Sequence, residues 1–267
     1  MIVGQIKKWV LRICLIFLFC SPVWAEQDFF SRDDHLAELI EKTKRSIVAV
    51  GTHYFNDVPK NKYMGTGFVI GSGRRIVTNY HVIHPVVEKK RQAYLRIFHK
   101  RFGPKGIKAR IVAENSFHDL AILEHDDQPL PALRLAHDDQ AKEGFKIAFT
   151  GYPLGLILGL NPTTHTGIIS SVAPLVRPSP SARIIDGSLI RHLNDPYDIL
   201  QIDATAYPGN SGSPVYRIAT GEVVGVINKV FVQGKKEHAI TNPTGITYAI
   251  PVRFVKTLEK KIGSSRQ

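Results

Sequence analysis

The sequence predicts an all-β protein of two antiparallel six-stranded β-barrels, with short helices near its N- and C-terminal ends. Short apolar runs rich in Val, Ile and Leu recur along the chain, and glycine, proline and asparagine separate them, which is typical of barrels. A stretch rich in Asp, Pro and Gln, residues 126–144, divides these runs into two groups of six. We therefore expect one barrel from each group, in domains that cover residues 46–130 and 131–255.

The candidate strands are the runs themselves, taken in chain order. Those of the first barrel are residues 47–50, 67–70, 75–78, 93–98, 107–113 and 120–123. Those of the second barrel are residues 146–151, 164–172, 200–204, 213–216, 223–231 and 246–250.

Two helices are expected outside the barrels. Within an N-terminal helical segment of residues 26–45, Leu36, Leu39 and Ile40 have helical spacing, which predicts an amphipathic helix over residues 33–44. After the last strand, residues 252–261 have a helix-like pattern that extends the second domain to about residue 262.

Residues 1–25 have the layout of a secretory signal peptide. Three basic residues start the segment, residues 10–19 form an apolar core, and Val23-Trp24-Ala25 offers a cleavage site. The apolar core is short for a membrane span, so we favour a signal peptide over an uncleaved N-terminal anchor. Both cysteines, Cys14 and Cys20, lie inside this segment, so the mature protein is expected to form no disulfide.

The chain is strongly basic, with a formal charge of +12 that falls to +9 without the predicted signal peptide. Such a charge is typical either of a solubilised surface or of contact with anionic lipid head groups or nucleic acid. The lysines and arginines are scattered, which favours the first interpretation and leaves contact with an anionic surface as the alternative. No nucleic-acid motif accompanies them, so we expect no nucleic-acid partner.

A serine between two glycines presents a nucleophile in the run Tyr207-Pro208-Gly209-Asn210-Ser211-Gly212-Ser213-Pro214. A serine hydroxyl is a weak nucleophile at neutral pH and needs a base within hydrogen-bond reach. The backbone N–H groups of Gly209 and Ser211 can point at one position because glycine tolerates the dihedral angles required. The run therefore predicts Ser211 as the nucleophile of an acyl transfer, with these two N–H groups as the oxyanion hole.

Two upstream segments supply candidate partners for Ser211. His81 closes the run Thr78-Asn79-Tyr80-His81 after a candidate strand, and an imidazole suits the role of general base. Asp119 opens another candidate strand, where its carboxylate would hold the imidazole in one tautomer. Asp203 is a rival carboxylate nearer to the serine, and we expect it to be structural.

These three motifs resemble those of the trypsin-like superfamily, and the chain is most similar to its HtrA/Deg bacterial branch. Further likenesses are Met64 to Ile70, Gly151 to Gly155, Gly167 to Ser170 and Gly245 to Pro251, so the resemblance covers residues 46 to 255. Ser213 stands where glycine is more usual, although glutamyl endopeptidases also have this serine. The branch commonly continues into PDZ domains, and none is expected here. The predicted signal peptide implies a location in the periplasm or outside the cell, and the lack of cysteines in the mature chain suits an HtrA-like periplasmic enzyme.

The primary specificity pocket is predicted from the spacing to Ser211. Thr205 is expected at its base, with Ile227 and Asn228 along its side. No carboxylate stands at Thr205, so a preference for Lys or Arg is not expected. A small or medium apolar residue such as Val or Ala fits these residues, as in the HtrA branch, and a pocket of this kind discriminates weakly.

Two long segments, residues 174–196 and 229–244, flank the predicted pocket. Loops of this length are usually functional or disordered. In HtrA-like enzymes the loops around the pocket switch between inactive and active arrangements. This resemblance leads to the hypothesis that the two segments gate the site.

The predicted function is a serine endopeptidase that hydrolyses peptide bonds through an acyl-enzyme, without metal or cofactor. Its substrates would be unfolded or exposed polypeptide segments, in periplasmic protein quality control or processing, and a homo-oligomer is compatible with the sequence. The alternative is a latent or non-catalytic module that keeps the fold and binds polypeptides as a chaperone does. An esterase is less well supported, because Ser211 leads into a candidate strand and not into the helix of α/β-hydrolases.

Overall fold

The computed structural model describes residues 23–55, 58, 60–88, 93–137, 141–153, 161–175, 196–228 and 246–264. The chain divides into two compact units after Leu39. Helix α2 (Val23–Lys44) contains this boundary and begins ten residues before the helix predicted at residue 33. It extends further because no glycine or proline interrupts these residues. Most of the predicted signal peptide, residues 1–22, lies outside the described residues.

Six antiparallel strands close into the first barrel in the order β1-β2-β3-β6-β5-β4. They are β1 (Ile47–Tyr54), β2 (Asn61–Ile70), β3 (Arg75–Thr78), β4 (Ala93–Phe98), β5 (Ile107–Asn115) and β6 (Leu120–Glu124). A short 3₁₀ helix, η1 (Lys100–Phe102), follows β4.

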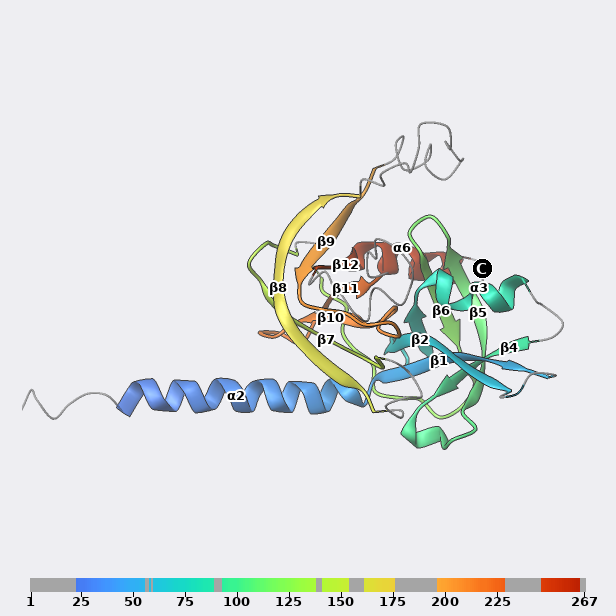
Figure 1. Cartoon of the computed structure of the whole chain (residues 1–267), viewed down its shortest axis with the longest axis horizontal. Coiled ribbons are helices and arrows are strands. Elements are labelled where there is room, and N and C mark those ends of the chain that lie inside the picture. Colours follow the sequence, from blue (N-terminus) through green and yellow to red (C-terminus); the bar gives the residue numbers. More distant parts are fainter. Residues whose placement is uncertain are drawn as a thin grey trace, which may run out of the picture. The chain divides into compact units, whose positions relative to one another are not determined.

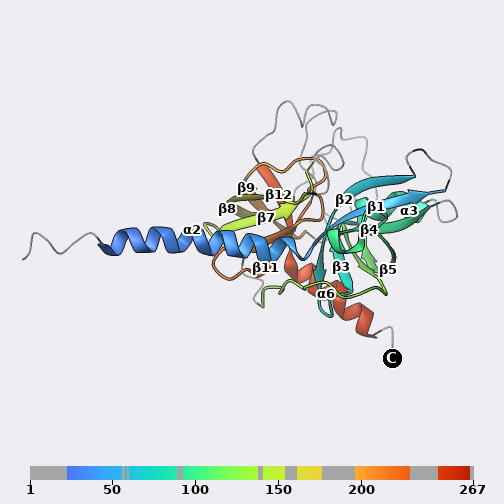
Figure 2. The ribbon, with the colours of Figure 1, turned by 90° about the horizontal axis from the view of Figure 1, so that it is seen from below.

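The second barrel closes in the order β10-β11-β12-β9-β8-β7, again with antiparallel pairs. Its strands are β7 (Lys146–Gly151), β8 (Thr163–Pro174), β9 (Asp198–Asp203), β10 (Pro214–Arg217), β11 (Val223–Ile227) and β12 (Ile246–Pro251). The barrels lie side by side in both ribbon views (Figures 1 and 2). The predicted fold of two six-stranded antiparallel barrels is confirmed.

Aliphatic side chains fill the interior of each barrel. In the first barrel Val48, Ile76 and Leu123 are fully buried, and in the second Ile147 and Ile202 are equally enclosed. Burying one such side chain stabilises a fold by about 1.5–3 kcal/mol. The apolar runs of the sequence therefore correspond to strands that are largely buried, such as β1, β6 and β11.

Helix α3 (Tyr80–Glu88), directly after β3, is an element that the sequence did not predict. It packs Val82, Ile83 and Val86 into the core of the first barrel. These β-branched residues and Pro85 favour a strand or a turn by intrinsic propensity, and burial of one helix face outweighs that preference. As a result, His81 lies in the first turn of a helix.

The C-terminal helix α6 (Val252–Ser264) confirms the helix expected there. Val252, Val255, Leu258 and Ile262 follow one another at helical spacing and are buried. The helix contacts β5 and β6 of the first barrel and β11 and β12 of the second. It therefore joins the two barrels. Within the described ranges, none of the helices has the length and apolarity needed to cross a membrane.

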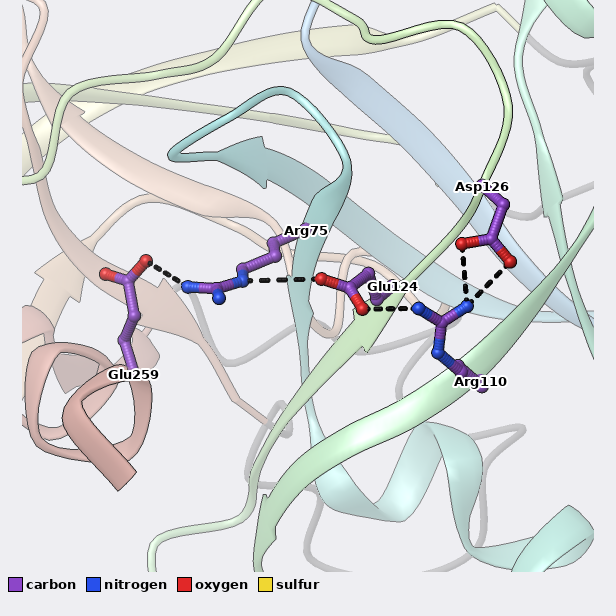
Figure 3. Close-up of polar contacts among 5 residues, drawn as sticks. All are labelled: Arg75, Arg110, Glu124, Asp126 and Glu259. Atoms are coloured by element: carbon purple, nitrogen blue, oxygen red, sulfur yellow. Dashed lines mark hydrogen bonds and ion pairs between the residues drawn. The ribbon is translucent and has the colours of Figure 1, made fainter. Parts of the chain in front are cut away.

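A series of ion pairs connects α6 to the first barrel (Figure 3). Glu124, whose side chain is 11% exposed, lies between Arg75 and Arg110. Arg75 Nη1 also contacts Glu259 Oε1 of α6 at 3.2 Å, and Arg110 Nη1 contacts both carboxylate oxygens of Asp126 at 2.9 and 2.7 Å. Glu124 is thus the least exposed carboxylate among the residues that the structure describes, and it pairs with two guanidinium groups.

Candidate active site

His81 and Asp119 lie together at one end of the first barrel, although they are far apart in sequence. Strands β3 and β6 pair antiparallel with Thr78 opposite Ala121, so the end of β3 lies beside the start of β6. His81 Nδ1 lies 2.7 Å from Asp119 Oδ2, and the His81 backbone N–H donates to Oδ1 at 2.8 Å. The carboxylate therefore holds both the ring and the backbone of His81, and Nε2 is the ring nitrogen left for chemistry.

The backbone of Asp119 is itself held in an unusual conformation. Its φ of 52° makes it the single non-glycine residue with positive φ in the described part of the chain. The N–H of Tyr80 and the side-chain amide of Asn79 both donate to the Asp119 carbonyl, at 3.1 and 3.0 Å. Asn79 is fully buried, so water does not compete for its hydrogen bond to the Asp119 carbonyl. The rival carboxylate, Asp203, is exposed on β9 of the second barrel.

Ser211 lies in the tight turn between β9 and β10 of the second barrel. The Asn210 N–H donates to the Tyr207 carbonyl at 3.0 Å, and the Ser213 N–H donates to the Asn210 carbonyl at 2.9 Å. Gly209 and Gly212 have φ values of 103° and 88°, a region that favours glycine. The glycines on either side of the serine are therefore required by the backbone of the turn.

This turn packs directly against the first barrel. The Ser211 carbonyl accepts the N–H of Thr66 in β2 at 2.8 Å. A Cβ placed on Gly65 would lie 3.0 Å from that carbonyl oxygen and 2.7 Å from Val82, the residue after His81. Gly65 thus allows the serine turn and the histidine helix to approach each other where the two barrels meet.

Among residues 209–213 of the turn, three backbone N–H groups have partners within the protein. Asn210 and Ser213 donate within the turn, and Gly212 donates to the Ile227 carbonyl at 2.9 Å. The N–H groups of Gly209 and Ser211 donate to no group among the residues that the structure describes. Preorganised donors with no internal partner are what an oxyanion hole needs.

The residues predicted to form the specificity pocket lie around the same turn. Ile227 ends β11, is fully buried, and donates its N–H to the Ser213 carbonyl at 2.8 Å. Asn228 follows it and donates its N–H to the Tyr248 carbonyl at 2.9 Å, while Thr205 is half-buried after β9. The proposed gating segments fall mostly on residues 176–195 and 229–245, which lie outside the described residues.

The unusual Ser213 fits because Gly151 has no side chain. Ser213 is fully buried, and its Oγ occupies the space where a Cβ on Gly151 would be. Asn210 and Thr66 also approach that position, so four polar or small residues meet beneath the serine turn. Sequence reasoning did not assign roles to Asn79 or Thr66, although both stand inside the motifs that carry the resemblance.

Comparison with known proteins gives a consistent family. Residues 65–226, more than half of the chain, match the family described as trypsin-like peptidase domain. A protein named "Probable periplasmic serine endoprotease DegP-like" from Rickettsia prowazekii is 27% identical over 89% of this chain and 41% of its own length. A protein of the same name from Chlamydia trachomatis is 30% identical over 76% of this chain and 34% of its own length.

Solved structures agree in fold. The Rv3671c protease from M. tuberculosis, in its active form, has a TM-score of 0.61 and 26% identity, over 84% of both chains. The HtrA-type protease AlgW has a TM-score of 0.61 at 22% identity, which shows the fold alone. The chain spans less than half the length of the DegP-like relatives it matches. By its matched residues and its two barrels, this chain belongs to the trypsin-like peptidase domain family.

Proposed function

We propose that this chain is a serine endopeptidase in which Ser211, His81 and Asp119 act as a catalytic triad. The observation that carries the proposal is the 2.7 Å contact between His81 Nδ1 and Asp119 Oδ2, together with a serine turn in which the N–H groups of Gly209 and Ser211 have no partner in the described chain. The His81 side chain is 25% exposed and that of Asp119 13%, which suits a base open to substrate and an orienting group shielded from water.

In the proposed reaction, Ser211 Oγ attacks the peptide carbonyl carbon while its proton passes to His81 Nε2. The Asp119 carboxylate stabilises the imidazolium, and the N–H groups of Gly209 and Ser211 bind the oxyanion. Collapse of the tetrahedral intermediate breaks the C–N bond as His81 gives its proton to the departing amine. Water, activated by His81, then attacks the acyl-enzyme and releases the acid product.

The substrates proposed are unfolded or exposed polypeptide segments, with small or medium apolar side chains before the cleaved bond. Thr205 and the buried end of β11 at Ile227 support this preference, because neither offers a charge for a basic or acidic side chain. The proposed role is protein quality control or processing in the periplasm, and self-association of the chain is proposed with it. The names of the relatives, which call them periplasmic serine endoproteases, support the location.

The test is incubation of the protein with an unfolded casein-like substrate and, separately, with a fluorophosphonate probe. Ser211→Ala should abolish cleavage and labelling, whereas Ser213→Ala, the same change two residues away, should keep both. Absence of cleavage and labelling in the unmodified protein would contradict the proposed function and favour the non-catalytic binding module.

A further inference from the structure

Thr66 of β2 contacts both residues whose N–H groups would bind the oxyanion. Its backbone N–H donates to the Ser211 carbonyl at 2.8 Å, and its hydroxyl donates to the Gly209 carbonyl, also at 2.8 Å. One residue of the first barrel thereby fixes two points of a turn that belongs to the second barrel. The relative position of those two points decides whether the two N–H groups converge.

Tyr63, three residues earlier on β2, adds a second hydroxyl to the same carbonyl. Its phenol oxygen lies 2.9 Å from the Gly209 carbonyl oxygen, 2.9 Å from that of Tyr152, and 3.3 Å from Thr66 Oγ1. The phenol has one proton to share between the two carbonyls. Desolvation raises the pKa of Tyr63, so the phenol stays a neutral donor.

Tyr152, which follows β7 of the second barrel, completes this hydroxyl bridge of Tyr63, Thr66, Tyr152 and Gly209. Its backbone N–H donates to Thr66 Oγ1 at 3.0 Å, and its carbonyl lies beside the Tyr63 phenol. Thr66 Oγ1 therefore accepts one hydrogen bond and donates another, which uses its hydroxyl proton fully. Two separate segments of the second barrel are thus attached to β2 through two side-chain hydroxyls.

We propose that Tyr63 and Thr66 are positioning residues that hold the oxyanion turn of the proposed protease in its productive geometry. The inference rests on the proposed function. Neither hydroxyl contacts the predicted donors themselves; both act through the carbonyl of Gly209. Loss of either hydroxyl frees the turn to move relative to Ser211, and misplacement by about 1 Å costs on the order of 100-fold in rate.

The activity test compares Thr66→Val and Tyr63→Phe with Thr66→Ser. The first two should lower kcat by about 10- to 100-fold with KM nearly unchanged, because the defect lies in transition-state stabilisation. Thr66→Ser keeps the hydroxyl and should restore kcat to within about threefold.

Thr150 and Tyr216 provide matched controls inside the second barrel. Both are fully buried, their hydroxyls lie 2.8 Å apart, and neither hydroxyl has a hydrogen bond to residues 204–213 in the described part of the chain. Thr150→Val and Tyr216→Phe remove the same chemical groups and should leave kcat within about threefold of the unmodified value. A merely structural loss would affect all four variants alike.

Hydrogen exchange gives a readout that does not depend on activity. Thr66→Val should speed exchange of the Asn210 and Ser213 amides by about tenfold, whereas Thr150→Val should not. If the unmodified protein lacks Ser211-dependent activity, the proposed function fails and exchange alone decides the positioning role. Unchanged exchange, or an unchanged kcat in an active protein, would overturn the inference.

Discussion

Gly65 is the position where one added methyl group should separate the histidine helix from the serine turn. In Gly65→Ala the new Cβ would lie 2.7 Å from Val82 Cγ2 and 3.0 Å from the Ser211 carbonyl oxygen. Carbon atoms in contact normally lie about 3.5–4.0 Å apart, so the neighbours must move by roughly 1 Å in total. Val82 is 1% exposed and has a stiff, branched side chain, so part of that shift falls on Ser211.

The expected loss of stability is moderate. Overpacking of this kind lowers the free energy of unfolding by about 1–3 kcal/mol. The change from glycine to alanine offsets about 0.4–1 kcal/mol of this loss, because it restricts the unfolded chain. A net loss of about 1–2 kcal/mol lowers Tm by about 2–8 °C for a chain of this size. The rate should fall further than stability suggests, by about 10- to 100-fold in kcat/KM, because the reacting groups are displaced.

Gly67→Ala is the matched control on the same strand. Its Cβ would lie 2.7 Å from Ile76 Cγ2 and 3.0 Å from Val50 Cγ2, an equally close approach inside the first barrel. The assay measures Tm and kcat/KM per folded molecule for both variants. Similar losses of Tm with an activity loss confined to Gly65→Ala are expected. Equal activity in the two variants would refute the steric argument.

Three further predictions concern the triad, the ion pairs and a buried histidine. Asp119→Asn should lower kcat by about 10³- to 10⁴-fold, because an amide at this position favours the wrong His81 tautomer. Its Tm should change by only a few degrees, because asparagine tolerates the positive φ of residue 119. Glu124→Gln should lower the free energy of unfolding, measured with heat or urea, by about 2 kcal/mol, because Glu124 is buried between two guanidinium groups. Asp126→Asn, at a carboxylate 84% exposed, should leave stability nearly unchanged, and equal losses in the two variants would contradict the burial argument. Burial lowers the pKa of His125, so the folded state resists its protonation and stability should fall as the pH drops below about 6.5. His125→Leu should therefore reduce the fall in Tm between pH 7.5 and 5, and an unchanged pH dependence of Tm would contradict this role of His125.

Much of the fold follows from local sequence pattern. Strands β3, β4 and β7 have the bounds expected from their apolar runs. Helix α3 could not be predicted, because Val82, Ile83 and Val86 have strand-like propensity and become helical through burial. Local pattern therefore describes the barrels better than it describes the element that carries His81.

The candidate site, too, is only partly predictable from local sequence. Ser211 and its turn can be recognised in the sequence because the backbone of the turn requires glycine at Gly209 and Gly212. The meeting of His81 with Asp119 depends on the register of β3 against β6, which sequence order alone does not specify. Likewise, the bridge from Thr66 to Gly209 joins residues 143 positions apart, so no local pattern could indicate it.

The measurement that tests the central claim most directly is mass-spectrometric mapping of a fluorophosphonate adduct, with its rate of formation. The account predicts one adduct, on Ser211. In a folded His81→Ala variant the labelling rate should be lower by at least about 10³-fold, because the serine then lacks its base. An adduct on another residue, or a rate on Ser211 that does not depend on His81, would contradict the proposed triad.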